Sequence, residues 1–273
     1  ARDELMYLSV GDGHRIYVKI FGNPDGIKVL FLHGGPGLGC SEADQLIFDP
    51  VKFQVVFIDQ RGCGKSTPRG GLAHNTTADL VSDIKLTLDY LGWPSVVVFG
   101  GSWGATLAIC FAAAFPKMVH RLILRGFFSA TKYTMDIYLR GQSKATHQRY
   151  WNRLMTHIPS MEQDVAAYVF QSITTKKAGY QKLGYEWTRY GFSLSRKSMT
   201  DAQIDRLVKR EDIDFDRIGI ELMYALNRFF MHEEYVFQQA TKVSLIPTVI
   251  IQGRHDHLCP LEDAQRLAKI MVN

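Results

Sequence analysis

The chain has 273 residues, of which 46% are hydrophobic and 22% charged, and its formal net charge is +5. This is the balance of a globular domain, and without a Lys/Arg block it gives no reason to expect a nucleic-acid partner. The four cysteines fit free thiols better than a disulfide framework, and no C-x-x-C pair indicates zinc. The N-terminal residues lack the apolar core of a signal peptide, so we expect a cytoplasmic protein.

The first hundred residues alternate between predicted strands and loops or helices. Residues 7–10 and 14–21 alternate apolar and polar side chains around a Gly-Asp-Gly turn, which predicts a β-hairpin. Residues 28–32 predict a buried strand, and the glycine-rich run HGGPG follows at residues 33–37. Residues 54–59 predict the next buried strand.

The later elements keep this alternation, with one long interruption. We expect helices over residues 76–91, 105–114 and 261–271, and strands over residues 96–99, 120–127 and 247–252. Between the last two strands lies a stretch rich in aromatic and charged residues at helical spacing. The pattern predicts an α/β fold, a mainly parallel sheet with helices on both faces. We expect a core of residues 1–128 and 243–273 and a helical cap of residues 129–242.

The run GGSWG at residues 100–104 matches G-x-S-x-G, the nucleophile elbow between a strand and a helix. Such a turn presents a serine hydroxyl above the sheet at the cost of backbone strain. Hydropathy alone would interpret the uncharged window 96–115 as a membrane span. Its central glycines and its strand-like start argue against that interpretation, so we expect no membrane association.

Acyl transfer by a serine needs a nucleophile, a base, an acid that orients the base, and donors for the oxyanion. Ser102 is the candidate nucleophile. Asp256 follows a predicted strand, where the orienting acid belongs, although a turn or helix-capping role is the simpler alternative. The backbone N–H groups of Trp103 and Gly35 are the candidate oxyanion donors.

The base is harder to place, because a histidine should follow the acid along the chain, and none occurs after His257. We expect that the catalytic histidine lies in a C-terminal segment outside this sequence. A metal site formed by Asp256 with its two neighbouring histidines is a weaker alternative, and we expect neither a metal nor a cofactor.

Several motifs together resemble one family: FLHGGPGLGC, DQRGCGKSTP, VFGGSWGATLA and IIQGRHDHLCP. They resemble the proline iminopeptidases, serine peptidases of the α/β-hydrolase fold. The resemblance implies a helical cap, catalysis without a metal, and release of an N-terminal proline from a small peptide or amide substrate. It implies Ser102 as nucleophile, Asp256 as triad acid, and Gly35 and Trp103 as oxyanion donors.

The cap departs from the family pattern, which holds the substrate amine with glutamates in motifs reading W-E-G and I-E-N-H-Y-F. Aligned on Trp187, the first glutamate is replaced by Thr188, although Glu186 lies nearby. In the second motif we place Leu226 at the glutamate and Arg228 at the histidine. The candidate substrate-binding residues are Gly34, Glu186, Trp187 and Phe229.

Three hypotheses follow. The first is a serine aminopeptidase of the proline iminopeptidase type. The second is an amide or ester hydrolase of the same fold that has lost the requirement for a free amine. The third is a non-catalytic binding protein built on this fold, motivated by the missing histidine.

Overall fold

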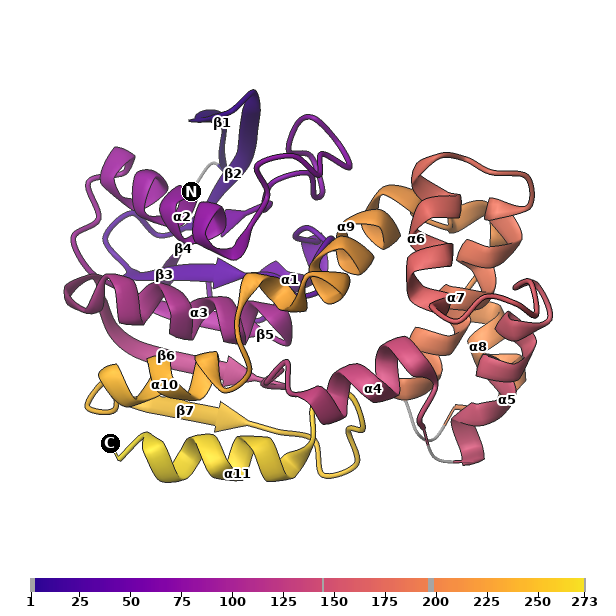
Figure 1. Cartoon of the computed structure of the whole chain (residues 1–273). Helices are drawn as coiled ribbons and strands as arrows, with labels where there is room; N and C mark the ends of the chain where they lie inside the picture. The colour runs from indigo at the N-terminus through magenta and orange to yellow at the C-terminus, as the bar shows by residue number, and fades with distance from the viewer. Residues whose placement is uncertain (1–2, 144, 196–198, 273) are drawn as a thin grey trace.

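The computed structural model describes residues 3–143, 145–195 and 199–272, which form a seven-stranded sheet with helices on both sides (Figure 1). The strand order is β1-β2-β4-β3-β5-β6-β7. Strands β1 and β2 form an antiparallel hairpin that joins β4 antiparallel, and all later pairs are parallel. The bounds are β1 Glu4–Gly11, β2 His14–Gly22, β3 Ile27–Leu32, β4 Phe53–Ile58, β5 Val96–Gly101, β6 Val119–Arg125 and β7 Thr248–Ile251.

The central strands are apolar on both faces, as expected for a parallel sheet covered on both sides. Alternate residues of β3 separate cleanly, because Leu30 and Leu32 join the larger core while Val29 and Phe31 join a smaller one. The smaller core is mostly aromatic, and Phe31 stacks on Phe99 with ring centroids 5.6 Å apart.

The larger core lies between the sheet and its main helices and continues among the helices that follow β6. Helix α2 begins after Thr76, whose hydroxyl accepts a hydrogen bond from the Asp79 N–H while the Asp79 carboxylate accepts from the Thr76 N–H. Helix α3 is buried on nearly every side. The bounds are α1 Glu42–Gln45, α2 Thr77–Tyr90, α3 Trp103–Ala114, α10 Tyr235–Lys242 and α11 Leu261–Ile270, and the sequence did not predict α1.

A lobe of helices projects from the carboxyl side of the sheet (Figure 1). Helix α4 leads into it from β6, helix α9 leads back, and α5 to α8 form its body. Its interior is aromatic, with Trp151 against Tyr190 and Tyr138 against Trp187. The bounds are α4 Lys132–Arg140, α5 Ala145–Met155, α6 Val165–Thr174, α7 Tyr180–Ser195, α8 Asp201–Leu207 and α9 Phe215–Leu226.

The proposed cap of residues 129–242 includes α10, which packs against α3 and α11 rather than against the lobe. This packing favours an earlier return of the chain to the core, and the division at residue 242 stays a prediction. All four cysteines are free thiols. Within the described ranges, no helix combines the length and the apolar character of a membrane-spanning segment.

Candidate active site

Ser102 lies at a sharp turn between β5 and α3. Its backbone adopts φ +55° and ψ −121°, a conformation that costs a non-glycine residue about 1–3 kcal/mol. Two hydrogen bonds hold the turn: the Ser102 N–H donates to the Arg125 carbonyl at 2.8 Å, and the Ala105 N–H donates to the Ser102 carbonyl at 2.9 Å. The predicted elbow geometry is therefore present.

The two outer glycines of the elbow allow the strand and the helix to approach closely. A Cβ on Gly100 would lie 2.2 Å from the carbonyl oxygen of Gly104, and one on Gly104 would lie 2.1 Å from that of Leu32. A Cβ on Gly101 would meet nothing within 4 Å. The motif thus needs glycine at its first and last positions for a steric reason, whereas its second position tolerates a side chain.

The glycine-rich loop after β3 lies directly beside the serine. A Cβ on Gly34 would lie 3.2 Å from the Cβ of Ser102. Gly35 has φ +115°, a region that side chains disfavour, and it lines the same cavity as Ser102. The structure therefore brings together the two loops from which the oxyanion donors are predicted.

Gln60, which follows β4, links these two loops. Its side-chain amide donates to the His33 carbonyl and accepts from the Trp103 indole N–H, both at 3.0 Å. Its backbone N–H donates to His33 Nε2 at 3.1 Å. Burial lowers the pKa of His33, which favours the neutral ring that accepts this bond. Sequence reasoning did not single out Gln60, although it belongs to the quoted DQRGCGKS motif.

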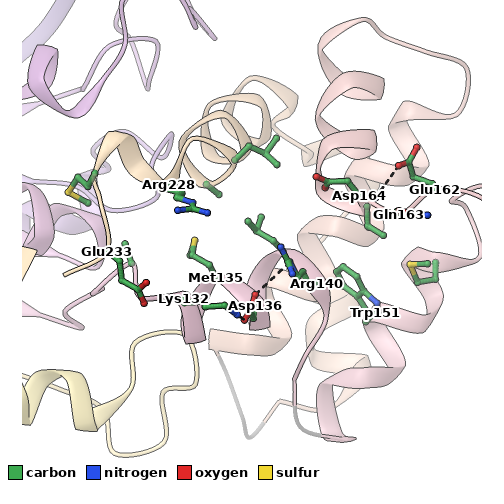
Figure 2. A pocket seen from close by; sticks show the side chains of 17 residues that line it. Lys132, Met135, Asp136, Arg140, Trp151, Glu162, Gln163, Asp164, Arg228 and Glu233 are labelled. Atoms are coloured by element: carbon green, nitrogen blue, oxygen red, sulfur yellow. Dashed lines mark hydrogen bonds and ion pairs between the residues drawn. The ribbon is translucent and has the colours of Figure 1, made fainter. Parts of the chain in front are cut away.

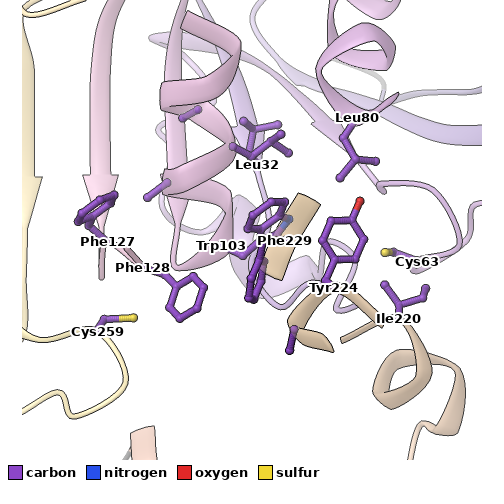
Figure 3. Packing of buried hydrophobic residues seen from close by; sticks show 14 of the residues in the cluster. Leu32, Cys63, Leu80, Trp103, Phe127, Phe128, Ile220, Tyr224, Phe229 and Cys259 are labelled. Carbon is purple, nitrogen blue, oxygen red and sulfur yellow. The ribbon is translucent and has the colours of Figure 1, made fainter. Parts of the chain in front are cut away.

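The Trp103 side chain is packed in the core at the start of α3. Its ring is completely buried and lies 5.3 Å from the Tyr224 ring and 5.2 Å from the Phe229 ring, measured between centroids (Figure 3). Arg228, Phe229 and Phe230 all have positive φ angles, so the turn after α9 is strained. This strained turn places the Phe229 ring between Trp103 and Phe128.

Asp256 lies in the loop after β7. One of its carboxylate oxygens accepts N–H bonds from Leu258 at 3.0 Å and Cys259 at 2.8 Å, so the turn role that the sequence left open is present. Burial raises the pKa of Asp256, and these two bonds oppose the rise. The loop adjoins the nucleophile, because the Cys259 thiol interacts with the Ser102 hydroxyl.

A cavity of about 250 Å³ opens in front of Ser102. Among the described residues that line it, only Arg217 and Glu221 are charged, and none is a histidine. Trp187 and Phe229, two of the candidate substrate-binding residues, line it. The lining residues are Gly35, Pro36, Leu38, Ser102, Phe128, Tyr138, Trp187, Thr188, Gly191, Phe192, Arg217, Glu221, Phe229 and Leu258.

The carboxylate of this cavity is Glu221 on α9, which sequence reasoning missed. The side chain is only 15% exposed, and burial raises its pKa to about 8. The Arg217 guanidinium, with Nη1 3.6 Å from Glu221 Oε2, favours the charged form. A signal existed in the sequence: Ile220 and Glu221 match the first two residues of I-E-N-H-Y-F, and Tyr224 matches the fifth.

The placement of Leu226 at the family glutamate is therefore wrong. Leu226 and Arg228 line a second cavity of about 740 Å³, between α4, the turn after α9 and the segment before α6 (Figure 2). The helix turns the Leu226 side chain away from the cavity of Ser102, because five residues, about 1.4 helical turns, separate Leu226 from Glu221.

Glu186 is also not brought to the cavity. Its carboxylate is buried inside the lobe, 3.1 Å from Arg189 Nη1 and 3.5 Å from Arg153 Nη2. Two arginines thus already neutralise this glutamate, and it is a structural residue of the lobe. Thr188 does line the cavity of Ser102, and its hydroxyl donates to the Gly184 carbonyl at 2.8 Å.

Residues 28–272 match the family described as the α/β-hydrolase fold. The proline iminopeptidase of Xylella fastidiosa (strain 9a5c) is 35% identical over 96% of this chain and 85% of its own length. That of Arabidopsis thaliana is 35% identical over 96% of this chain and 70% of its own. The chain belongs to the proline iminopeptidase family. The resemblance and the fold class expected from the sequence are thereby confirmed.

Solved structures show the same fold at lower sequence identity. An esterase from Exiguobacterium antarcticum aligns with a TM-score of 0.65 and 20% identity over 97% of this chain and 87% of its own. The proline iminopeptidase of Mycobacterium smegmatis aligns with a TM-score of 0.62 and 19% identity over 98% of this chain and 86% of its own. Identities this low support the fold and carry nothing about the substrate.

Proposed function

We propose that the protein is a serine peptidase that releases an N-terminal proline, or a similar residue, from small peptides through an acyl-enzyme. Its family membership makes it a serine hydrolase of the proline iminopeptidase type. The observation that carries the substrate assignment is the presence of Ser102 and Glu221 on the walls of one cavity. A nucleophile and a buried carboxylate are what cleavage next to a free amine requires.

In the proposed mechanism, Ser102 Oγ attacks the carbonyl carbon of the first residue. A histidine base accepts the hydroxyl proton and later passes it to the leaving amine, while Asp256 orients the imidazole. The N–H groups of Gly35 and Trp103 stabilise the oxyanion, and each such donor is typically worth about 3–4 kcal/mol in the transition state. Water then hydrolyses the acyl-enzyme and regenerates the serine.

Substrate selection follows from the rest of the cavity. The ammonium group of the substrate is held by Glu221, since a buried cation needs an anionic partner. The pyrrolidine ring packs against apolar walls that include the aromatic rings of Phe128, Trp187 and Phe229. Small peptides are the substrate class that fits a cavity of about 250 Å³.

A second candidate function is an amide or ester hydrolase that does not require a free amine. The observation that favours it is Thr188, which lines the cavity at a position where the family motif has an acid. With one carboxylate and one guanidinium, the charges of the lining side chains cancel, which weakens the attraction for an ammonium group.

The two functions are separated by comparing kcat/KM for prolyl 4-nitroanilide and N-acetylprolyl 4-nitroanilide. If the protein is an aminopeptidase, we expect kcat/KM to be at least about 100-fold higher for the compound with the free amine. The acetylated compound would leave the buried Glu221 carboxylate without a partner, which is costly. Equal rates would favour the second function. Ser102→Ala should abolish turnover of both compounds, whereas wild-type activity in that variant would contradict any serine mechanism. Absence of turnover in the unsubstituted full-length protein, with the catalytic histidine present, would instead favour a binding protein.

A further inference from the structure

We propose that Arg217 and Glu221 together recognise both termini of a dipeptide, with Glu221 binding the α-ammonium group and Arg217 the C-terminal carboxylate. This inference rests on the proposed function and adds to it a substrate class, free Pro-Xaa dipeptides. It assigns to Arg217 a role in specificity that the sequence analysis did not consider.

The first support is the charge inventory of the cavity. Among the described lining residues, Arg217 is the one basic side chain and Glu221 the one acidic side chain, and most of the others are apolar. Both charged side chains are largely removed from solvent, with exposed fractions of 20% and 15%. A ligand that carries one charge of each sign would partner both groups, whereas a ligand with the ammonium group alone would compete with Arg217 for Glu221.

The second support is the loose contact between the two groups. Their closest atoms are 3.6 Å apart, longer than the 2.7–2.9 Å of a charge-assisted hydrogen bond. Within the described ranges, the Arg217 guanidinium donates no hydrogen bond, so its N–H groups are available to a ligand. A substrate carboxylate would supply two acceptors in the bidentate geometry that guanidinium favours.

The third support is spacing. The two residues lie one turn apart on α9, a rise of about 5.4 Å per turn. A dipeptide is at most about 7 Å long when extended, so its termini span a comparable distance. Each further residue would move the carboxylate about 3.4 Å away. This rise separates the points where the two side chains leave the helix, whereas their charged ends lie 3.6 Å apart. A dipeptide therefore bridges the pair when the two side chains turn toward its opposite ends.

The fourth support is the position of Arg217 relative to the loop of the oxyanion donors. A Cβ on Gly37 would lie 2.8 Å from the Arg217 carbonyl oxygen and 3.1 Å from its Cγ. The residue thus packs directly on the HGGPG loop and lines the same cavity as Gly35 and Ser102. A carboxylate held there lies beside the loop that borders Ser102.

Binding to the Ser102→Ala protein tests the proposal without requiring turnover. Isothermal titration calorimetry compares Pro-Gly with Pro-Gly amide, Pro-Gly-Gly and N-acetyl-Pro-Gly. We expect Pro-Gly to bind at least about tenfold more tightly than its amide and than Pro-Gly-Gly, the effect of one charge-assisted pair. Adding Arg217→Gln should reduce the preferences for Pro-Gly over its amide, and over Pro-Gly-Gly, to less than about twofold in Kd. The matched control Arg228→Gln, an exposed arginine of the other cavity, should leave them unchanged.

Equal affinity for Pro-Gly and its amide in the Ser102→Ala protein would overturn the proposal, and this comparison needs no folded Arg217 variant. A preference that persists after Arg217→Gln would also overturn it. The comparison with N-acetyl-Pro-Gly keeps the proposed function separate. If the free amine is required but the carboxylate is not, the aminopeptidase stands and the dipeptide proposal fails. If the acetylated peptide binds as well as Pro-Gly, both fail.

Discussion

Gly104, at the start of α3, packs so closely on the end of β3 that a Cβ on it would lie 2.1 Å from the carbonyl oxygen of Leu32. The residue after Leu32 opens the glycine-rich loop, and two residues before Gly104 is the nucleophile. The packing of one glycine therefore fixes the distance between the two loops that would bind the oxyanion. Catalytic geometry and stability are coupled at this contact.

Gly104→Ala should destabilise the protein by about 3 kcal/mol or more, because the added methyl meets backbone that has little room to move. The measurement is the urea midpoint followed by far-UV circular dichroism. Gly101→Ala is the matched control, since its Cβ would meet nothing within 4 Å, and it should change stability by less than about 1 kcal/mol. A stable Gly104→Ala protein would show that the close approach is not needed.

Gln60→Ala should lower kcat more than it raises KM. The variant loses the two side-chain hydrogen bonds that connect the His33 carbonyl to the Trp103 indole. These bonds hold the loop of Gly35 and the start of α3 in fixed positions, so their loss displaces both predicted oxyanion donors without removing any contact to the substrate. A loss of about 10- to 100-fold in kcat is the expected scale for a misplaced donor. Steady-state kinetics on prolyl 4-nitroanilide measure it.

Gln54→Ala provides the control for this prediction, because Gln54 on β4 bonds Lys28 at the other end of the sheet and should leave kcat unchanged. Loss of two buried hydrogen bonds also lowers the stability of Gln60→Ala by about 2 kcal/mol. A variant that is destabilised but retains full kcat would show that Gln60 is only a structural residue.

The elbow and the sheet were predictable from the sequence because local chemistry dictates them. A strained turn needs small neighbours, and buried parallel strands need apolar residues on both faces, so GGSWG at residues 100–104 and the strand before it carry their own signal. The turn around Asp256 was left open between two roles, and its two N–H bonds show that the turn role is real.

The cap was less predictable because it is helical. When a motif is aligned to a helix with an error of a few residues, the side chain assigned to the site lies on another face of that helix. Leu226 and Glu221 differ by five positions and line different cavities. Glu186 has the right charge, but two arginines from the same lobe neutralise it. No local pattern reveals such tertiary pairing, which depends on which helices meet.

Glu221→Gln should weaken binding of free-amine substrates at least about tenfold, because the amide cannot form an ion pair with the ammonium group. Affinity of the unsubstituted protein for Pro-Gly amide should rise as the pH rises toward about 8, where the buried carboxyl ionises more readily. Calorimetry between pH 6 and pH 8.5 measures both effects. Glu233→Gln, which lies at the other cavity, is the control. An unchanged affinity in Glu221→Gln would place the amine elsewhere.

The same carboxyl should make stability depend on pH. Its pKa is raised by burial from 4.5 to about 8, so between these values the folded protein holds a proton that the unfolded chain has released. The contribution of Glu221 to the free energy of unfolding is therefore fully present below about pH 4.5. It decreases as the pH rises toward 8, by no more than about 1.4 kcal/mol per pH unit. Urea midpoints of the wild type and Glu221→Gln at pH 5, 6.5 and 8 isolate the effect, since other titrating groups are common to both. The wild type should lose stability relative to the variant as the pH rises. A constant difference would mean that Arg217 keeps Glu221 ionised throughout this range.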